Sequence, residues 1–143
     1  MPGVSHSAVI DVPRQRVFDY VNDYNNVPDY MFGITRFDPT TDHTSGLGAT
    51  FNAEMSVGPK VLKSTVETKE WVDGELIALV SVDGFPANTT WRFADADGGT
   101  RVEVEFQYKL PGGLSGRALG AILEPFVGQA IKQTDNNLRS QLV

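Results

Sequence analysis

Residues 50–67, TFNAEMSVGPKVLKSTVE, decide the fold, because two runs of alternating apolar and polar residues flank the turn pair Gly58-Pro59. Alternation with a period of two is typical of strands buried on one face. If the pair forms a two-residue turn, the opposed residues of one face are Phe51 with Val66, Ala53 with Ser64, and Met55 with Leu62. On the other face Glu54 meets Lys63. The stretch therefore predicts an antiparallel hairpin with an apolar inner face and an ion-paired outer face.

The same counting of opposed residues, applied around the turn Asp97-Gly98-Gly99, predicts a second hairpin. Its expected pairs are Phe93 with Val102 and Trp91 with Val104 inside, and Arg92 with Glu103 outside. Turn residues at Asp73-Gly74 and at 84–86 extend the pattern into an antiparallel meander over residues 49–108. Residues 76–82 are apolar on both faces, so the period leaves the orientation of that strand open.

The most periodic segment lies at the end of the chain, after the break Pro111-Gly112-Gly113. Its apolar residues follow i, i+3, i+4, i+7 spacing: Leu119, Ile122, Leu123, Phe126, Val127, Ala130, Ile131, Leu138 and Leu142. This spacing predicts a long amphipathic helix that packs on the sheet. Pro125 removes one backbone hydrogen bond, so we expect either a bend at residues 121–125 or a main helix that begins there.

Before the meander, residues 5–12 predict a first strand, and Pro13 suits the first position of a helix. Val17, Val21 and Tyr24 follow with helical spacing, and a second short helical turn is expected at residues 27–31. The sequence thus predicts an α+β fold and one domain over residues 1–143. Its curved antiparallel sheet of about seven strands wraps around a long C-terminal helix, with two short helices between the first and second strands.

The order of elements and several local motifs resemble the helix-grip proteins of the START and polyketide cyclase/dehydrase superfamily (SRPBCC), which includes birch-pollen-allergen-like proteins. The motifs are Ile10-Asp-Val-Pro13 with 17–21, residues 23–30 with Pro28, Trp91-Arg-Phe93 followed by 99–102, and Leu110-Pro-Gly-Gly113. The resemblance spans almost the whole chain. It implies a cavity under the long helix for lipids, sterols, polyketides or similar molecules. Some members of the superfamily are aromatases or cyclases, many only bind or transfer ligands, and a few act through protein contacts.

Composition excludes several classes of function. The chain has no cysteine, which excludes disulfides and thiolate metal sites. Its formal net charge of −6 opposes nucleic-acid binding, and no Lys/Arg cluster offsets it. No apolar run is long enough for a transmembrane segment, and the N-terminus lacks the pattern of a signal peptide, so cytoplasmic residence is expected. The two histidines lie far apart without a ligand motif, so we expect neither a metal site nor a cofactor.

The predicted registers place inward an apolar and aromatic set that we expect to contact a ligand. Its members are Phe51, Met55, Trp91, Phe93, Phe106 and Tyr108 from the strands, and Leu119, Leu123, Phe126 and Ala130 from the helix. An ordinary filled core would also explain them. Tyr108 is the one candidate for a catalytic group, because a phenol can bury its ring while its hydroxyl orients a ligand oxygen. Thr134 interrupts the apolar stripe and either faces the pocket or bonds to its own helix, and residues 30–32 are expected at the rim.

Charged strand residues are predicted to face outward, which leaves Ser64, Thr68, Thr89 and Tyr108 as the inward polar groups. That set is poor for acid–base catalysis. Asp83 either reaches the cavity rim or is a turn residue, and His6 and His43 are expected to be satisfied or solvated. The favoured function is therefore binding or transport of a small hydrophobic ligand. A polyketide cyclase, aromatase or dehydratase is the alternative, and a protein-interaction module is the third.

Overall fold

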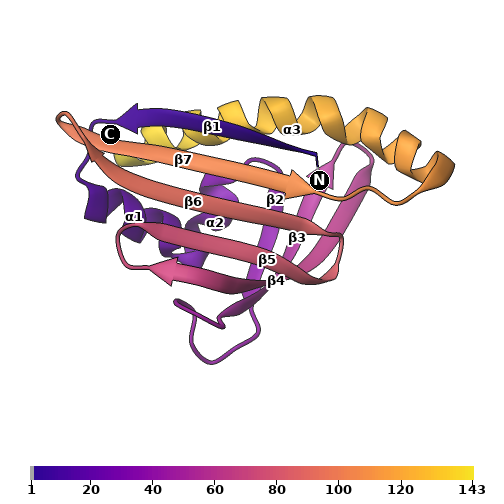
Figure 1. Ribbon diagram of the computed structural model, residues 1–143, viewed down its shortest axis with the longest axis horizontal. Helices are drawn as coiled ribbons and strands as arrows, with labels where there is room; N and C mark the ends of the chain where they lie inside the picture. Colours follow the sequence, from indigo (N-terminus) through magenta and orange to yellow (C-terminus); the bar gives the residue numbers. More distant parts are fainter. Residues whose placement is uncertain (1) are drawn as a thin grey trace.

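The computed structural model describes residues 2–143 and consists of one seven-stranded antiparallel sheet curled into a half-barrel, with three α-helices (Figure 1). The strands are β1 (Gly3–Ile10), β2 (Ile34–Pro39), β3 (Thr50–Val57), β4 (Lys60–Val72), β5 (Leu76–Gly84), β6 (Ala87–Ala96) and β7 (Gly99–Tyr108). Their order in the sheet is β1-β7-β6-β5-β4-β3-β2. The predicted α+β helix-grip architecture is confirmed.

Two short helices, α1 (Arg14–Asn22) and α2 (Val27–Tyr30), lie between the first two strands, as predicted, with a 3₁₀ turn at Tyr24–Asn26 between them. α1 ends where the Asp23 carboxylate accepts a hydrogen bond from the Asn25 N–H and caps the 3₁₀ turn. The first strand begins at Gly3 and ends at Ile10, two residues earlier at each end than the alternation predicted.

Both predicted hairpin registers are confirmed. Phe51 pairs with Val66 and Glu54 with Lys63 across β3 and β4, and Val57 faces Lys60 around the two-residue turn. Trp91 pairs with Val104 across β6 and β7. The strand whose orientation the sequence left open is β5: Ile77 faces Trp91 and Leu79 faces Thr89, so both point to the inner side of the sheet.

The long helix α3 (Gly113–Leu142) packs against β1, α2 and β3 and runs beside β1 in Figure 1. It begins at Gly113, so the alternative that the main helix begins at Pro125 is wrong. Pro125 lies inside the helix on its exposed side, as does Ala121, whose carbonyl loses its helical partner. Water can hydrate that carbonyl, which lets the helix continue past the proline.

Buried residues form two clusters. The larger one gathers around α1 and the carboxyl end of α3 and contains Phe18, Phe93 and Leu138. The smaller one lies under the first half of α3 and contains Val57, Phe106, Tyr108, Leu123 and Val127. The interior between sheet and helix is therefore packed at both ends, with room for a cavity between the two clusters.

Candidate functional site

The main cavity lies between the inner face of the sheet and α3. It offers about 1020 Å³ of space free of protein atoms, including the solvent at its open side. All seven strands, α2, the loop after α2 and α3 contribute side chains to its wall.

The wall of the cavity is almost entirely hydrocarbon and aromatic. None of the side chains that line it is an aspartate, glutamate, lysine, arginine or histidine. Its hydroxyl groups are those of Tyr30, Ser64, Thr89 and Thr134. The charged strand residues lie on the outer face, where Glu54 is in contact with Lys63 at 3.8 Å and with Arg36 at 3.6 Å. The cavity is therefore suited to hold an apolar molecule out of water.

Tyr30 of α2 is one of the residues that line the cavity. Its ring is buried and stands edge-on to Trp91, with ring centroids 5.7 Å apart. Its hydroxyl donates a 2.7 Å hydrogen bond to the Val21 carbonyl. Burial raises the pKa of this phenol far above its ordinary value, and the nearby Tyr20 and Asp23 raise it further. The Tyr30 hydroxyl thus ties α2 to α1 and stays protonated.

Tyr30 should make the protein sensitive to alkali. The folded state keeps the phenolic proton where the unfolded chain loses it, so its contribution to stability is complete below about pH 10 and is lost as the pH rises. We expect the free energy of unfolding to fall by about 1.4 kcal/mol per pH unit above that value. Tyr30→Phe should reduce this slope and cost about 1 kcal/mol at neutral pH through the lost hydrogen bond.

Urea unfolding between about pH 8 and pH 11.5 measures that slope. Tyr20 and Tyr108, whose pKa values burial also raises, should leave a residual slope in the variant. An unchanged slope in Tyr30→Phe would show that this phenol does not control alkaline unfolding.

The loop between α2 and β2 forms the rim of the cavity, and hydrogen bonds hold it from both sides. The Thr134 hydroxyl accepts from the Phe32 N–H at 3.1 Å and donates to the Ala130 carbonyl at 2.8 Å. Thr134 therefore faces the cavity and also bonds to its own helix, which unites the two predicted possibilities. Asn137 donates to the Tyr30 carbonyl at 3.2 Å, so α3 holds this loop at two points.

On the other side of the rim, the Gly33 carbonyl accepts a 2.8 Å hydrogen bond from the Ser56 N–H of β3. Gly33 has φ +92°, where other residues are strained, and a Cβ there would lie 2.6 Å from the end of the Phe126 ring, so the position favours glycine. Phe32 and Phe126 lie with ring centroids 5.8 Å apart, and Phe32 is 40% exposed. The rim thus presents an aromatic pair to solvent at the cavity edge.

Half of the residues predicted to contact a ligand line this cavity: Met55, Trp91, Phe106, Phe126 and Ala130. The other half lie elsewhere. Phe51 lines a smaller second hollow together with Thr68, and Phe93 packs against Phe18 in the larger cluster. Tyr108 and Leu123 are buried in the smaller cluster, and Leu119 is half-buried on α3.

Tyr108 lies in the smaller buried cluster rather than on the cavity wall. Burial raises the pKa of its phenol, and the carboxylate of Glu124 on α3 raises it further. Its strand neighbours across the sheet are Ala87 on β6 and the backbone of Pro2 near the start of the chain. The structure therefore places this candidate group at the end of the sheet where α3 begins.

Several cavity residues lay outside the predicted set, among them Ile34, Phe37, Leu79, Phe85, Val127 and Ile131. Ile34 and Phe37 belong to β2, which is distorted by a bulge and shows no regular alternation. Val127 and Ile131 belong to the same apolar stripe as Ala130. Each directly follows a predicted contact, Phe126 or Ala130, so taking every residue of the stripe from 126 to 131 would have found them.

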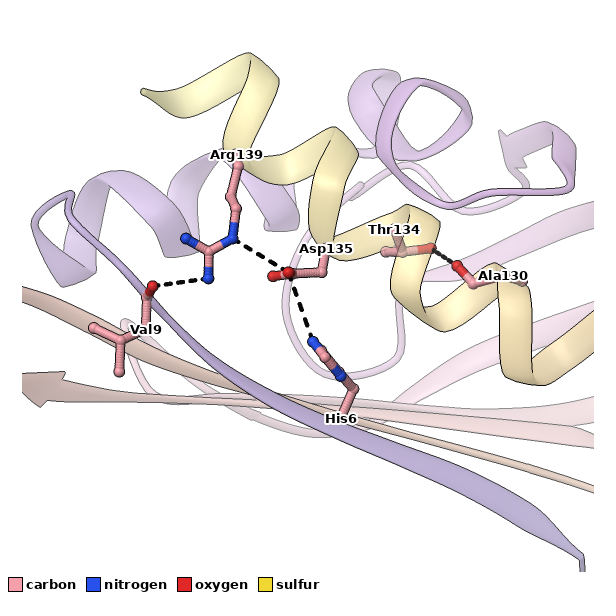
Figure 2. A network of polar contacts seen from close by, with 6 residues as sticks. All are labelled: His6, Val9, Ala130, Thr134, Asp135 and Arg139. Atoms are coloured by element: carbon pink, nitrogen blue, oxygen red, sulfur yellow. Dashed lines mark hydrogen bonds and ion pairs between the residues drawn. The ribbon is translucent and has the colours of Figure 1, made fainter.

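The predicted histidines lie outside the cavity. His43 is in a loop, where its Nε2 is 3.0 Å from the Leu47 carbonyl oxygen. His6 Nε2 lies 3.7 Å from the Asp135 carboxylate, which also contacts Arg139 at 3.2 Å (Figure 2). Arg139 in turn donates to the Val9 carbonyl at 2.9 Å. This network ties α3 to the edge strand β1.

Asp83 was the remaining candidate for a group at the cavity rim. Asp83 is exposed and lies opposite Thr65 in a groove on the outer side of the sheet, away from the main cavity. Within residues 2–143, no group of three or more histidine, cysteine, aspartate or glutamate side chains is placed to hold a metal ion. No helix among these residues is long and apolar enough to cross a membrane.

Comparisons with known proteins agree with this architecture. Among solved structures, the chain is similar to the protein TTHA0849 from Thermus thermophilus, with a TM-score of 0.83, 20% sequence identity, and coverage of 99% of this chain and 97% of the other. It is also similar to the Zhui aromatase/cyclase from Streptomyces sp. R1128, with a TM-score of 0.78, 13% identity, and coverage of 99% and 93%.

A START superfamily protein from Mycobacterium smegmatis is similar as well, with a TM-score of 0.75, 11% identity, and coverage of 98% of this chain and 96% of that one. At these identities the likeness concerns the fold. None of the curated proteins compared with the sequence matches it significantly. The family model described as "Polyketide cyclase / dehydrase and lipid transport" matches residues 1–143. The chain therefore belongs to the polyketide cyclase/dehydrase and lipid transport family.

Proposed function

We propose that residues 1–143 act as one binding unit that holds or transports a small hydrophobic molecule in the main cavity. The observation that supports the proposal is the composition of the cavity wall, which consists of hydrocarbon and aromatic side chains without a charged group. Apolar ligands gain free energy there because they leave water, at roughly 25 cal/mol per Å² of buried surface. The family description, which includes lipid transport, supports the same function.

The family description and the similar aromatase/cyclase also raise the alternative of an enzyme. Cyclisation and dehydration need an acid or a base within hydrogen-bonding reach of the substrate. The main cavity has one ionisable side chain on its wall, Tyr30, and the hydroxyl of that residue is bonded to Val21. The composition of the wall thus supports binding over catalysis.

The test is the detection of bound molecules. Native mass spectrometry of the purified protein, before and after extraction with organic solvent, should show one apolar molecule per chain. The extracted protein should enhance the emission of an apolar fluorophore with one-to-one stoichiometry. A protein that carries no molecule and does not bind the fluorophore would contradict the proposed function.

A further inference from the structure

The hydroxyl groups that line the cavity differ in whether they already form hydrogen bonds within the protein. Thr134 both donates and accepts within the protein, and the Tyr30 hydroxyl is bonded to Val21. Ser64 donates a 2.6 Å hydrogen bond to the Phe85 carbonyl. Thr89 is the remaining one, and its hydroxyl makes no hydrogen bond with any residue in the described part of the chain.

The position of Thr89 favours a role toward a ligand. It lies on β6, where Leu79 of β5 and Phe106 of β7 are its direct neighbours, and all three side chains line the cavity. A hydroxyl flanked by apolar groups has lost part of its water, and a ligand oxygen can replace that hydration. Thr89 is thus a polar side chain in an otherwise apolar part of the cavity wall.

The charge of a ligand is limited by the same wall. An ionised group that enters the cavity leaves water, and no residue of opposite charge lines the wall to compensate it. A neutral hydroxyl or carbonyl oxygen costs far less to bury and is compensated by one hydrogen bond. The composition of the wall therefore favours uncharged over charged ligands.

We infer that the cavity selects uncharged, mostly hydrocarbon molecules with a hydroxyl or carbonyl oxygen, and that the Thr89 hydroxyl binds this oxygen. The inference rests on the proposed binding function and specifies its ligand class. Trp91, two residues along the same face of β6, has an indole N–H that makes no hydrogen bond with a described residue either. It is the competing donor, and the experiment separates the two.

The probes are naphthalene, 2-naphthol and 2-naphthoate, which share a fused-ring shape and differ in their polar group. Their dissociation constants are measured at pH 7 by displacement of the apolar fluorophore. The wild-type protein should bind 2-naphthol roughly three- to tenfold more tightly than naphthalene, the effect of one neutral hydrogen bond. It should bind the anionic 2-naphthoate at least about tenfold more weakly than 2-naphthol.

Substitutions test which side chain causes the preference for 2-naphthol over naphthalene. Thr89→Val keeps the shape and should remove the preference for 2-naphthol over naphthalene, while Thr89→Ser should retain it. Thr90→Val is the matched control, because Thr90 is the next residue on β6 and faces the outer side opposite Ala78 and Glu105. It should leave all three affinities unchanged. Circular dichroism and thermal unfolding check that each variant is folded.

Different failures have different meanings. Loss of the preference in Trp91→Phe but not in Thr89→Val would overturn the assignment to Thr89. Equal binding of 2-naphthol and 2-naphthoate, or no binding of 2-naphthol while the fluorophore binds, would overturn the ligand class and leave the binding function intact. If neither the probes nor the fluorophore bind, the proposed function itself fails.

Discussion

Replacing Phe18 by alanine should lower the free energy of unfolding by about 3–5 kcal/mol. Phe18 is 1% exposed and joins α1 to the sheet, with its ring edge-on to Phe93 at 5.3 Å and to Trp71 at 5.7 Å between centroids. The variant loses the burial of a whole ring and leaves a void that these neighbours fill only in part. Urea unfolding followed by circular dichroism measures the loss.

The matched control is Leu114→Ala, because Leu114 is a large apolar residue that is 82% exposed at the start of α3. Its stability should stay within about 0.5 kcal/mol of the wild type. A loss of less than about 1 kcal/mol in Phe18→Ala would show that α1 is held to the sheet by other contacts.

Filling the cavity should weaken ligand binding without unfolding the protein. Ala130 of α3 and Ala53 of β3 both line the main cavity, so Ala130→Trp and Ala53→Trp each place an indole in the space available to a ligand. We expect the affinity for the apolar fluorophore to fall at least about tenfold in each variant, because ligand and indole compete for one volume. Fluorescence titration of the extracted protein measures it.

Ala118→Trp is the control for these variants, since Ala118 lies on α3 but is exposed. It should bind the fluorophore like the wild type. Unchanged binding by both cavity variants would place the fluorophore elsewhere, for example in the second hollow that Phe51 lines. Thermal unfolding of all three variants should show that the fold tolerates the indole.

The sheet could be predicted from the sequence because its signals are local. A two-residue turn fixes which residues face each other, and Phe51 could only pair with Val66 once Gly58-Pro59 was taken as the turn. The orientation of β5 could not be read from its own residues, since both faces are apolar. The pairing of Ile77 with Trp91 determines it, which is a contact between two strands.

The cavity could be predicted only in part, because alternation tells which side of a strand is inside but not what covers it. Trp91 and Phe93 share one face of β6, yet Trp91 lines the cavity and Phe93 packs against Phe18. The difference arises because α1 fills the space over one end of the sheet. The alternation of apolar and polar residues in the strands gives no information on where that helix lies.

The same limit applies to the residues of α3, because periodicity does not show what lies against each of them. Leu123 and Ala130 belong to one apolar stripe, but Leu123 is fully buried among Val57 and Tyr108, whereas Ala130 faces open space. Periodicity assigns both to the inner side of the helix. Whether that side meets packed side chains or a cavity depends on how the strands beneath it curve.

The hydrogen bonds that hold the rim loop also affect how fast a ligand can enter and leave the cavity. Withdrawing the loop from the cavity would break three hydrogen bonds, those of Phe32 with Thr134, Tyr30 with Asn137 and Gly33 with Ser56. Rotation of the Phe32 side chain breaks none of them. Local opening of backbone hydrogen bonds takes microseconds or longer, whereas exposed side chains change rotamer in picoseconds to nanoseconds. Small ligands that pass the Phe32 ring should therefore exchange rapidly, and bulkier ones should wait for the slower opening.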